Sequence, residues 1–268
     1  MAIAVRERTP PPGRAASPGI AAVLGVLEAV DRLGEANLAD LAGATGLPKT
    51  TLHRACAAME EREFLERAGE CGYALGRRAV ALGTRNRGSA LMSAFEVEAE
   101  GLLARHNETT CLVVLDGRDA LFIAKEETSQ PVRLVTRVGS RLPAFAAASG
   151  RILLAAMPPD AVDRLLTGVE LVTPVGGRLR GLDQLHEILD VVRANGYAEN
   201  VNETALGLRC LAVPVTGRCG ETVAAMTLCV PAGRIDRRRR RRMLADLRAA
   251  GLRASASLHA LNQPPGSA

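Results

Sequence analysis

Residues 46–54, which read GLPKTTLHR, bring together side chains that can contact a charged or hydrogen-bonding partner. The stretch carries an ammonium, an imidazole, a guanidinium and two hydroxyl groups, on Lys49, His53, Arg54, Thr50 and Thr51. Such groups suit DNA, where arginine and threonine read base edges and lysine neutralises phosphates. They also suit the water-facing side of a helical protein-interaction module. The elements around the stretch must decide between these two interpretations.

Helical periodicity divides the stretch and its continuation into an inner and an outer face. Four apolar side chains follow the spacing i, i+3, i+4 and i+7, which is one side of a helix: Leu52, Ala55, Cys56 and Met59. Thr50, His53 and Arg54 fall opposite this side, with Lys49 and Thr51 on its flanks. The sequence thus predicts a helix with a short, polar and cationic outer surface at its N-terminal end.

Two further helices precede this one. Ser17 and Pro18 predict the start of the first helix, and Gly34 its end. Its core face is predicted from apolar residues at helical spacing: Ile20, Val23, Leu24, Leu27, Val30 and Leu33. The second helix, LADLAGAT, has Asn37 as its N-cap, Asp40 in its first turn and Gly46 at its end. Two helices joined by a short glycine-containing turn predict a helix-turn-helix.

The segment FLERAGECGYALG, after these helices, predicts two short strands joined by a turn. A hairpin in this place makes the helix-turn-helix a winged one, and Arg67 is a candidate to reach a phosphate or the minor groove. Glu63 stands where a glycine with positive φ would end the helix. Either the chain leaves the helix by another route or Glu63 is strained.

Several segments resemble the DNA-binding domain of IclR-type bacterial transcriptional regulators. GLPKTTLHR matches that family's GL-P-K/S-S/T-T-x-x-R segment, flanked by LADLAGAT, MEEREFLER and YALGRRAVALG. Downstream, VGSRLPAFAAASGRILLA and LHEILDVVRANGYAENVNETALGLRCLAVPV are similar to the family's effector-domain motifs. The resemblance covers residues 17–262. It implies a winged helix-turn-helix, a GAF-like effector-binding domain, and dimers or tetramers.

The second half of the chain predicts an α+β domain with a mainly antiparallel sheet. Strand patterns flank a hairpin signal at Asp116-Gly117 and continue at VRLVTRV, 197–202, 208–216 and 221–230. Helices are expected at 149–157, 160–167, 182–195 and 236–261. The expected organisation is a disordered leader (1–16), a winged helix-turn-helix domain (17–76), a helical linker (77–107), an effector-binding domain (108–262) and a tail (263–268).

The candidate effector site combines small residues before a helix with polar residues on strands. In AAASGR, free backbone N–H groups at a helix start suit an anion. Asn200 and Cys210 are expected to point inward, and Thr227 and Cys229 share one face of a strand because they are two residues apart. The resemblance implies that the pocket is built from these positions, with Ala148 and Ser149 contributing backbone groups. Ordinary strand packing would also explain buried cysteine and threonine.

The chain departs from the pattern of the family that it resembles at three of these positions. Asn200 is neutral where many relatives have an acidic residue, and Thr227 and Cys229 stand where several have serines. An anionic effector, such as an organic or aromatic acid, tolerates the lost carboxylate, whereas a less polar ligand suits the thiols. The sequence leaves the two classes open.

Composition excludes several other functions. With no Trp, four Phe and two Tyr, the chain lacks stacking platforms for single-stranded nucleic acid. The N-terminus lacks a secretory signal and no apolar run reaches membrane length, so we expect a cytoplasmic protein with six reduced cysteines. No CxxC pair, phosphate loop or nucleophile elbow appears, so no metal, cofactor or catalytic residue is expected.

Charge alone does not locate the DNA-binding surface. The net charge is +5, but residues 1–85 carry 11 Lys and Arg against 10 Asp and Glu. The run of six arginines at 237–242 would wrap around a helix, which predicts a solvated patch more than a second DNA site. The sequence predicts a regulator that binds a pseudo-palindromic operator in double-stranded DNA under control of a small effector. The alternative is a sensor or enzyme with a vestigial DNA-binding domain.

Overall fold

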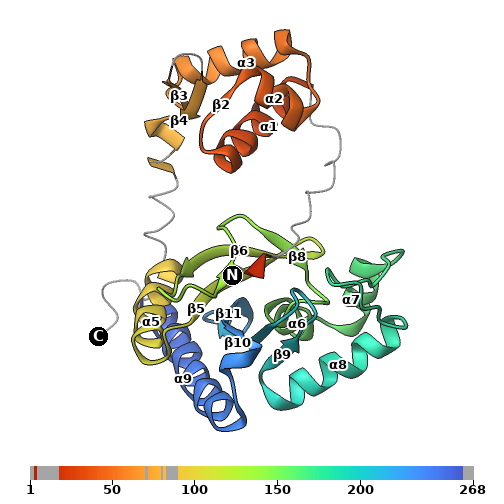
Figure 1. Ribbon diagram of the computed structural model, residues 1–268. Coiled ribbons are helices and arrows are strands. Elements are labelled where there is room, and N and C mark those ends of the chain that lie inside the picture. The colour runs from red at the N-terminus through yellow and green to blue at the C-terminus, as the bar shows by residue number, and fades with distance from the viewer. Residues whose placement is uncertain (1–2, 5–17, 70–71, 80, 83–89, 262–268) are drawn as a thin grey trace. The chain divides into compact units, whose positions relative to one another are not determined.

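The computed structural model describes residues 3–4, 18–69, 72–79, 81–82 and 90–261 (Figure 1). Its chain divides into two compact units: one formed by residues 11–89, and the other by residues 1–10 together with 90–268. Ser17, the predicted first N-cap, lies outside the described residues, as do Cys71 and the predicted tail at 263–268. No helix of the described part is both long and apolar enough to cross a membrane.

The smaller unit is a helix-turn-helix with a three-stranded wing. Its helices are α1 (Pro18–Leu33), α2 (Leu38–Thr45) and α3 (Lys49–Glu61), as the sequence predicts. The hairpin consists of β3 (Leu65–Ala68) and β4 (Gly72–Leu75). A short strand that the sequence did not reveal, β2 (Ala36–Asn37), pairs with β4 and gives the sheet order β2-β4-β3.

Capping fixes the turn between the helices. The Asn37 side chain accepts hydrogen bonds from the amides of Ala39 and Asp40, at 2.7 and 3.0 Å. The Asp40 carboxylate in turn accepts from the Asn37 amide at 3.0 Å, which completes a capping box. Gly46 ends α2 with φ of 68°, a conformation that glycine adopts without strain. These contacts confirm the predicted start and end of α2.

The predicted core face of α1 is partly wrong. Ile20, Leu24 and Leu33 are 58, 52 and 49% exposed. Val30 is buried as predicted, and Val23 and Leu27 are half-buried against the same core. The other buried positions of the helix were not predicted: Ala22, Val26 and Ala29. Apolar residues occur on all sides of α1, so periodicity alone did not mark the buried side. The prediction therefore favoured the large side chains over the alanines.

The strain suspected at Glu63 is present. Its φ is 62°, a region that non-glycine residues rarely adopt. The turn is held from outside the helix, because the amide of Arg78 donates to the Glu63 carbonyl at 3.0 Å and that of Gly76 to the Phe64 carbonyl at 2.9 Å. A Cβ on Gly76 would lie 2.4 Å from the Glu63 carbonyl oxygen, so this position requires glycine.

The larger unit is built on a six-stranded antiparallel sheet of order β8-β6-β5-β11-β10-β9. Its strands are β5 (Thr109–Asp116), β6 (Asp119–Glu126), β8 (Arg141–Pro143), β9 (Ala198–Val201), β10 (Leu208–Thr216) and β11 (Thr222–Pro231). The α+β prediction with a mainly antiparallel sheet is confirmed. β8 was missed, since three residues give little alternation to detect.

Helices cover both faces of this sheet (Figure 1). On one face α5 (Ala90–His106) and α9 (Arg237–Leu261) pack against each other and against β5 and β10. On the other, α6 (Ala148–Ala155) lies against β10, β11 and β5, and α8 (Leu182–Asn195) packs on α6. α7 (Pro159–Leu166) shares a core with α8. α5 thus belongs to the body of this unit, although the sequence placed it in a linker.

A second departure concerns the chain start and the VRLVTRV segment. Instead of a strand of the main sheet, this segment contributes only β7 (Leu134–Val135), which pairs in parallel with β1 (Ile3–Ala4). Residues 3–4 therefore form a strand inside the predicted disordered leader; the rest of that leader lies outside the described residues.

Candidate functional site

The outer face of α3 presents its polar side chains to solvent. Thr50, His53 and Arg54 are exposed, as is Lys49 at the first position of the helix, while Thr51 is half-buried on the flank. The predicted inner face is confirmed, since Leu52, Ala55, Cys56 and Met59 are buried in one apolar cluster. Within the described residues, no ion pair or side-chain hydrogen bond engages Lys49, His53 or Arg54. Their donors and charges remain available to an external partner.

Arg67 of the wing, in contrast, already contacts other side chains of the protein. Its Nε donates to Glu60 Oε1 at 3.0 Å, and its guanidinium lies 4.5 Å from the centre of the Tyr73 ring. The structure therefore places Arg67 against the last turn of α3, apart from the polar residues of the first turns. Glu60 therefore competes with a phosphate for this guanidinium group.

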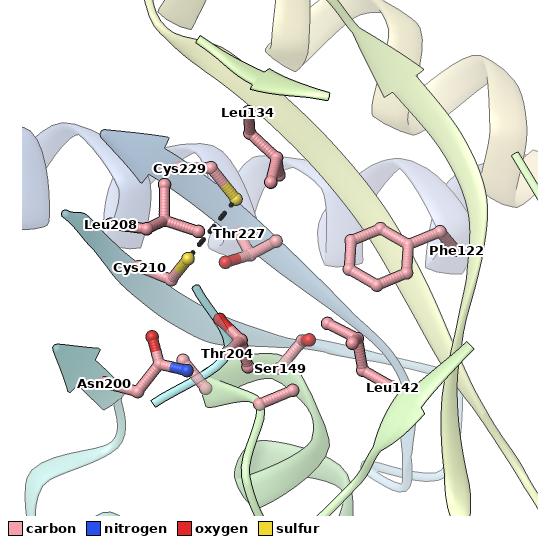
Figure 2. A pocket seen from close by; sticks show the side chains of 12 residues that line it. Phe122, Leu134, Leu142, Ser149, Asn200, Thr204, Leu208, Cys210, Thr227 and Cys229 are labelled. Atoms are coloured by element: carbon pink, nitrogen blue, oxygen red, sulfur yellow. Dashed lines mark hydrogen bonds between the residues drawn. The ribbon is translucent and has the colours of Figure 1, made fainter. Parts of the chain in front are cut away.

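The six predicted effector-site residues all line one cavity in the larger unit (Figure 2). They come from the start of α6 and from β9, β10 and β11, and all are buried: Ala148, Ser149, Asn200, Cys210, Thr227 and Cys229. The cavity measures about 10 Å³, roughly the space that one water molecule requires. An aromatic acid would enter only after surrounding side chains move outward.

The sequence did not identify the other half of the wall. Phe122, Leu134 and Leu142 turn toward the same space as Thr227 and Cys229 (Figure 2). Thr204 and Leu208 come from the chain that joins β9 to β10 and from the start of β10. These residues look like ordinary core in the sequence, because only strand pairing brings them to the cavity.

Asn200 gives the cavity its clearest polar feature. Its Nδ2 donates to the Ala146 carbonyl at 2.9 Å, which ties β9 to the segment before α6. Its Oδ1 is buried and has no hydrogen-bond partner among the described residues. A buried acceptor without a donor is costly, so this position favours a ligand that brings a hydroxyl or N–H group. Thr227 is different, because its hydroxyl already donates to the Leu211 carbonyl at 2.9 Å.

The start of α6 offers donors to the same cavity. Ala147 is the N-cap and supplies no side-chain acceptor, so the first amides of the helix lack a capping partner. Gly150 allows this helix to lie tightly on the preceding turn, since a Cβ there would be 2.2 Å from the Ala144 carbonyl oxygen. Free amides and the helix dipole together suit a carboxylate.

Arg151, just inside α6, holds the chain around the cavity together. This buried side chain donates from Nε to the Phe145 carbonyl at 2.8 Å and from Nη1 to Glu203 Oε1 at 3.0 Å. Glu203 neighbours Thr204, a residue of the wall. The ion pair thus fixes one side of the cavity relative to α6.

Three cysteine side chains lie close together on the sheet, and two of them line the cavity. Cys210 and Cys229 lie directly opposite each other on β10 and β11, with their sulfur atoms 3.5 Å apart. Cys111 on β5 is hydrogen-bonded to Cys229 as well. This bond and burial raise the pKa of Cys111 and, likewise, that of Cys210, whereas the S–H groups of both hold the pKa of Cys229 below its ordinary value. All three are free cysteines, as are Cys56 and Cys219.

The arginine run on α9 is divided between structural and solvated roles. Arg239 donates to Glu108 Oε1 at 3.0 Å and to the Arg234 carbonyl at 2.6 Å. Arg240 donates to the Glu199 carboxylate at 2.9 Å, which raises the pKa of its guanidinium. The remaining arginines of the run are exposed, and their i, i+1, i+4 and i+5 spacing puts them on one side of the helix: Arg237, Arg238, Arg241 and Arg242. The six arginines do wrap around the helix, but the ion-paired Arg239 and Arg240 take the inner side, which leaves a solvated patch of four.

Comparison with known proteins gives consistent matches over both units. Family models match for the IclR helix-turn-helix domain over residues 21–69 and for the bacterial transcriptional regulator IclR C-terminal domain over residues 87–256. The HTH-type transcriptional regulator KdgR of Escherichia coli K12 is 29% identical over 238 residues, covering 88% of this chain and 90% of KdgR. The transcriptional repressor IclR of the same organism is 31% identical over 214 residues, or 75% of each chain.

A solved structure extends the match to a liganded relative. An IclR homolog complexed with 4-hydroxybenzoate, from Microbacterium hydrocarbonoxydans, superposes with a TM-score of 0.78 at 27% identity. The match covers 90% of this chain and 99% of that one. KdgR and IclR are transcriptional regulators, and the solved structure is that of an IclR homolog.

Proposed function

Because the chain belongs to the IclR family of bacterial transcriptional regulators, we propose that α3 reads an operator whose occupancy is set by an effector in the Asn200 cavity. The family combines a helix-turn-helix DNA-binding domain with a C-terminal effector-binding domain, and the chain contains both. Binding DNA and responding to a small molecule are therefore its general activities.

For DNA, the observation that carries the proposal is the set of exposed, unpartnered groups on α3. Thr50, His53 and Arg54 enter the major groove, where a recognition helix contacts base edges with its N-terminal residues. Lys49 and Thr51 contact the phosphates beside them. Arg67 has at most a secondary role, because Glu60 already partners it. Binding takes place in the cytoplasm, where bacterial DNA is accessible.

The operator is pseudo-palindromic and the protein binds it as a homodimer or tetramer. Helix-turn-helix proteins commonly read two half-sites with two copies related by symmetry. The exposed apolar side chains of α1, such as Ile20 and Leu24, lie one turn apart and would be shielded in such an assembly. Light scattering after size-exclusion chromatography measures the number of copies, and a monomer at micromolar concentration would contradict this part of the proposal.

The effector is an organic acid that also carries a hydrogen-bond donor. The amides at the start of α6 receive the carboxylate, and Asn200 Oδ1 accepts from the donor group. 4-Hydroxybenzoate has both groups, and its presence in a relative of similar structure supports this class. The side chains around the small cavity must move apart to admit it, so we expect binding to be accompanied by local opening.

Gel-shift measurements on the DNA flanking the protein's own gene test the DNA part. We expect binding that prefers this DNA over a scrambled competitor. Equal affinity for both would contradict operator recognition.

Thermal-shift and titration measurements with 4-hydroxybenzoate test the effector part. Asn200→Ala is expected to weaken binding about tenfold, because one hydrogen bond to a buried group is lost. Asn195→Ala, at the exposed end of α8, is the matched control and should bind like the parent. Unchanged binding by Asn200→Ala would show that the cavity is not the effector site.

A further inference from the structure

Beyond operator and effector binding, we infer that Cys210 and Cys229 are a modification site: a dithiol that a hydroperoxide converts into a reversible disulfide. Their sulfur atoms are 3.5 Å apart, and both residues line the cavity. The formation of this bond does not depend on the proposed function. Its effect on ligand binding rests on the cavity being the effector site.

The strand register favours a bond at this pair. The amide of Ala232 donates to the Gly207 carbonyl at 2.7 Å, so the pair one step beyond Leu208–Pro231 is hydrogen-bonded. Antiparallel pairs alternate, which makes Cys210–Cys229 a non-hydrogen-bonded pair, three steps further along. In such pairs the Cα atoms are about 4.5 Å apart, within the range of about 4.4–6.8 Å that disulfides span. The expected Cα separation is thus compatible with a disulfide between the two side chains.

Contacts among the three thiols indicate which cysteine reacts first with the peroxide and which one reacts second. Cys229 accepts S–H hydrogen bonds from Cys210 and Cys111, which stabilise its thiolate, so Cys229 is the thiol of the three that most readily loses its proton and reacts first. Cys210 is within contact distance to resolve the first product. The third thiol, Cys111, is opposite Thr227 and thus diagonal to Cys229, which is a less direct geometry for pairing. In the described part of the chain no group of three His, Cys, Asp or Glu residues suits a metal ion, so oxidation is favoured over metal binding.

The chemistry balances with one peroxide per disulfide. Cys229 Sγ attacks one peroxide oxygen, the O–O bond breaks, and the thiol proton leaves with the departing oxygen as an alcohol or water. The Cys229 sulfenic acid is then attacked by Cys210 Sγ, the S–O bond breaks, and hydroxide leaves with the Cys210 proton as water. The two thiols are oxidised by two electrons and the peroxide is reduced by two. A small dithiol reductant reverses the step by exchange.

Oxidation changes the cavity wall chemically. Two S–H groups that donate or accept hydrogen bonds become one apolar bridge, next to Thr227 and on the strand beside Asn200. The reduced and oxidised proteins should therefore differ in affinity for a polar ligand. We expect at least a threefold difference for 4-hydroxybenzoate.

Mass spectrometry of the full-length protein tests the bond. A Cys219→Ser background removes one exposed thiol that could join two copies. After treatment with equimolar hydrogen peroxide and alkylation, we expect a Cys210–Cys229 cross-linked peptide that dithiothreitol removes. Cys111→Ser should retain the cross-link, whereas Cys210→Ser and Cys229→Ser should lose it. Circular dichroism melts establish that each variant is folded; for a serine variant that is not, the alanine variant replaces it.

Two results would overturn the inference. One is peroxide-treated protein in which Cys210 and Cys229 are both alkylated or carry sulfinic acid; the other is a cross-link to Cys111 instead. Titration of 4-hydroxybenzoate into reduced and oxidised protein then separates the two proposals. A cross-link with no ligand binding in either form would leave the dithiol site standing and contradict the effector class. Ligand binding without a cross-link would contradict the dithiol site and leave the effector class standing.

Discussion

The first turns of α3 and of α9 are both cationic, yet their charges stand in different surroundings. The α9 run has six arginines, of which Arg239 and Arg240 are ion-paired to carboxylates, while the other four lie on one exposed side of the helix. The α3 surface has one lysine, one arginine and one histidine on a single side, none of them paired within the described residues. Both helices thus have an exposed cationic side, and what distinguishes α3 is the pair of threonine hydroxyls beside its cations and its place as the second helix of the helix-turn-helix. The number of charges is a poor guide to recognition.

The largest expected effect comes from removing the carboxylate that holds Arg239 of α9 and Arg234 just before this helix. Glu108 is 1% exposed and accepts hydrogen bonds from Arg234 Nε at 2.9 Å and from Arg239. Glu108→Gln should lower the free energy of unfolding of the larger unit by about 3 kcal/mol, since it leaves two guanidinium groups without a counter-charge. Chemical denaturation followed by circular dichroism measures this. Arg164→Ala, which breaks an exposed pair with Asp160, is the control and should leave the midpoint unchanged.

Next in size is the loss of the arginine on the α3 face. Arg54→Ala should weaken operator binding by about 1–3 kcal/mol, or roughly 5- to 150-fold, if the side chain reads a base. Stability should not change, because Arg54 has no partner within the protein's described part. Gel-shift titration measures the affinity. Arg62→Ala, at the far end of the same helix, is the matched control, and an equal loss there would show that only bulk charge matters.

A smaller effect is expected from relieving the backbone strain just after α3, which should change stability and leave operator affinity unchanged. Glu63 has a φ of 62° and its side chain is ion-paired to Arg77. Glu63→Gly removes the backbone strain at the cost of an exposed ion pair, so the melting temperature of the smaller unit should rise by about 4 °C. Calorimetry measures the rise, and operator affinity should stay the same. A fall in melting temperature would mean that the ion pair outweighs the strain.

The smallest effect is expected from the solvated arginines of α9. The double variant Arg241→Gln, Arg242→Gln should change operator affinity less than twofold at physiological salt, with a slightly shallower salt dependence. Both side chains are exposed, so folding should be unaffected. Gel shifts at several salt concentrations measure both quantities. A loss as large as that of Arg54→Ala would break the distinction between the two helices.

Much of the architecture could be read from local signals. Gly46, Asn37 and the hairpin at Asp116-Gly117 define turns by their own conformational preferences, so the elements they separate were predicted closely. The exposed side of α1 was not, because apolar side chains surround that helix and only contact with α2 and α3 selects Ala22 and Ala29 for burial. Strands of two or three residues, such as β2 and β8, have too little alternation to be recognised.

The candidate site, too, could be predicted only where local spacing in the sequence indicates it. The two-residue spacing of Thr227 and Cys229 predicts that they share a face, and the structure places both at the cavity. That Cys210 lies opposite Cys229 depends on strand register, which the sequence does not state. Phe122 and Leu142 carry no sign of a special role, because an apolar wall and an apolar core have the same composition.

The hydrogen bonds that close the wing have a mechanical consequence. The amides of Gly76 and Arg78 are bound to the carbonyls of Phe64 and Glu63, the residues that follow the end of α3. Residues 76–78 are therefore clamped to the turn that directly follows α3. They cannot be displaced without breaking these two bonds or shifting the turn that ends the helix. The wing is thus a bracket as well as a hairpin, because it fixes the path of the chain just after β4 relative to the end of α3.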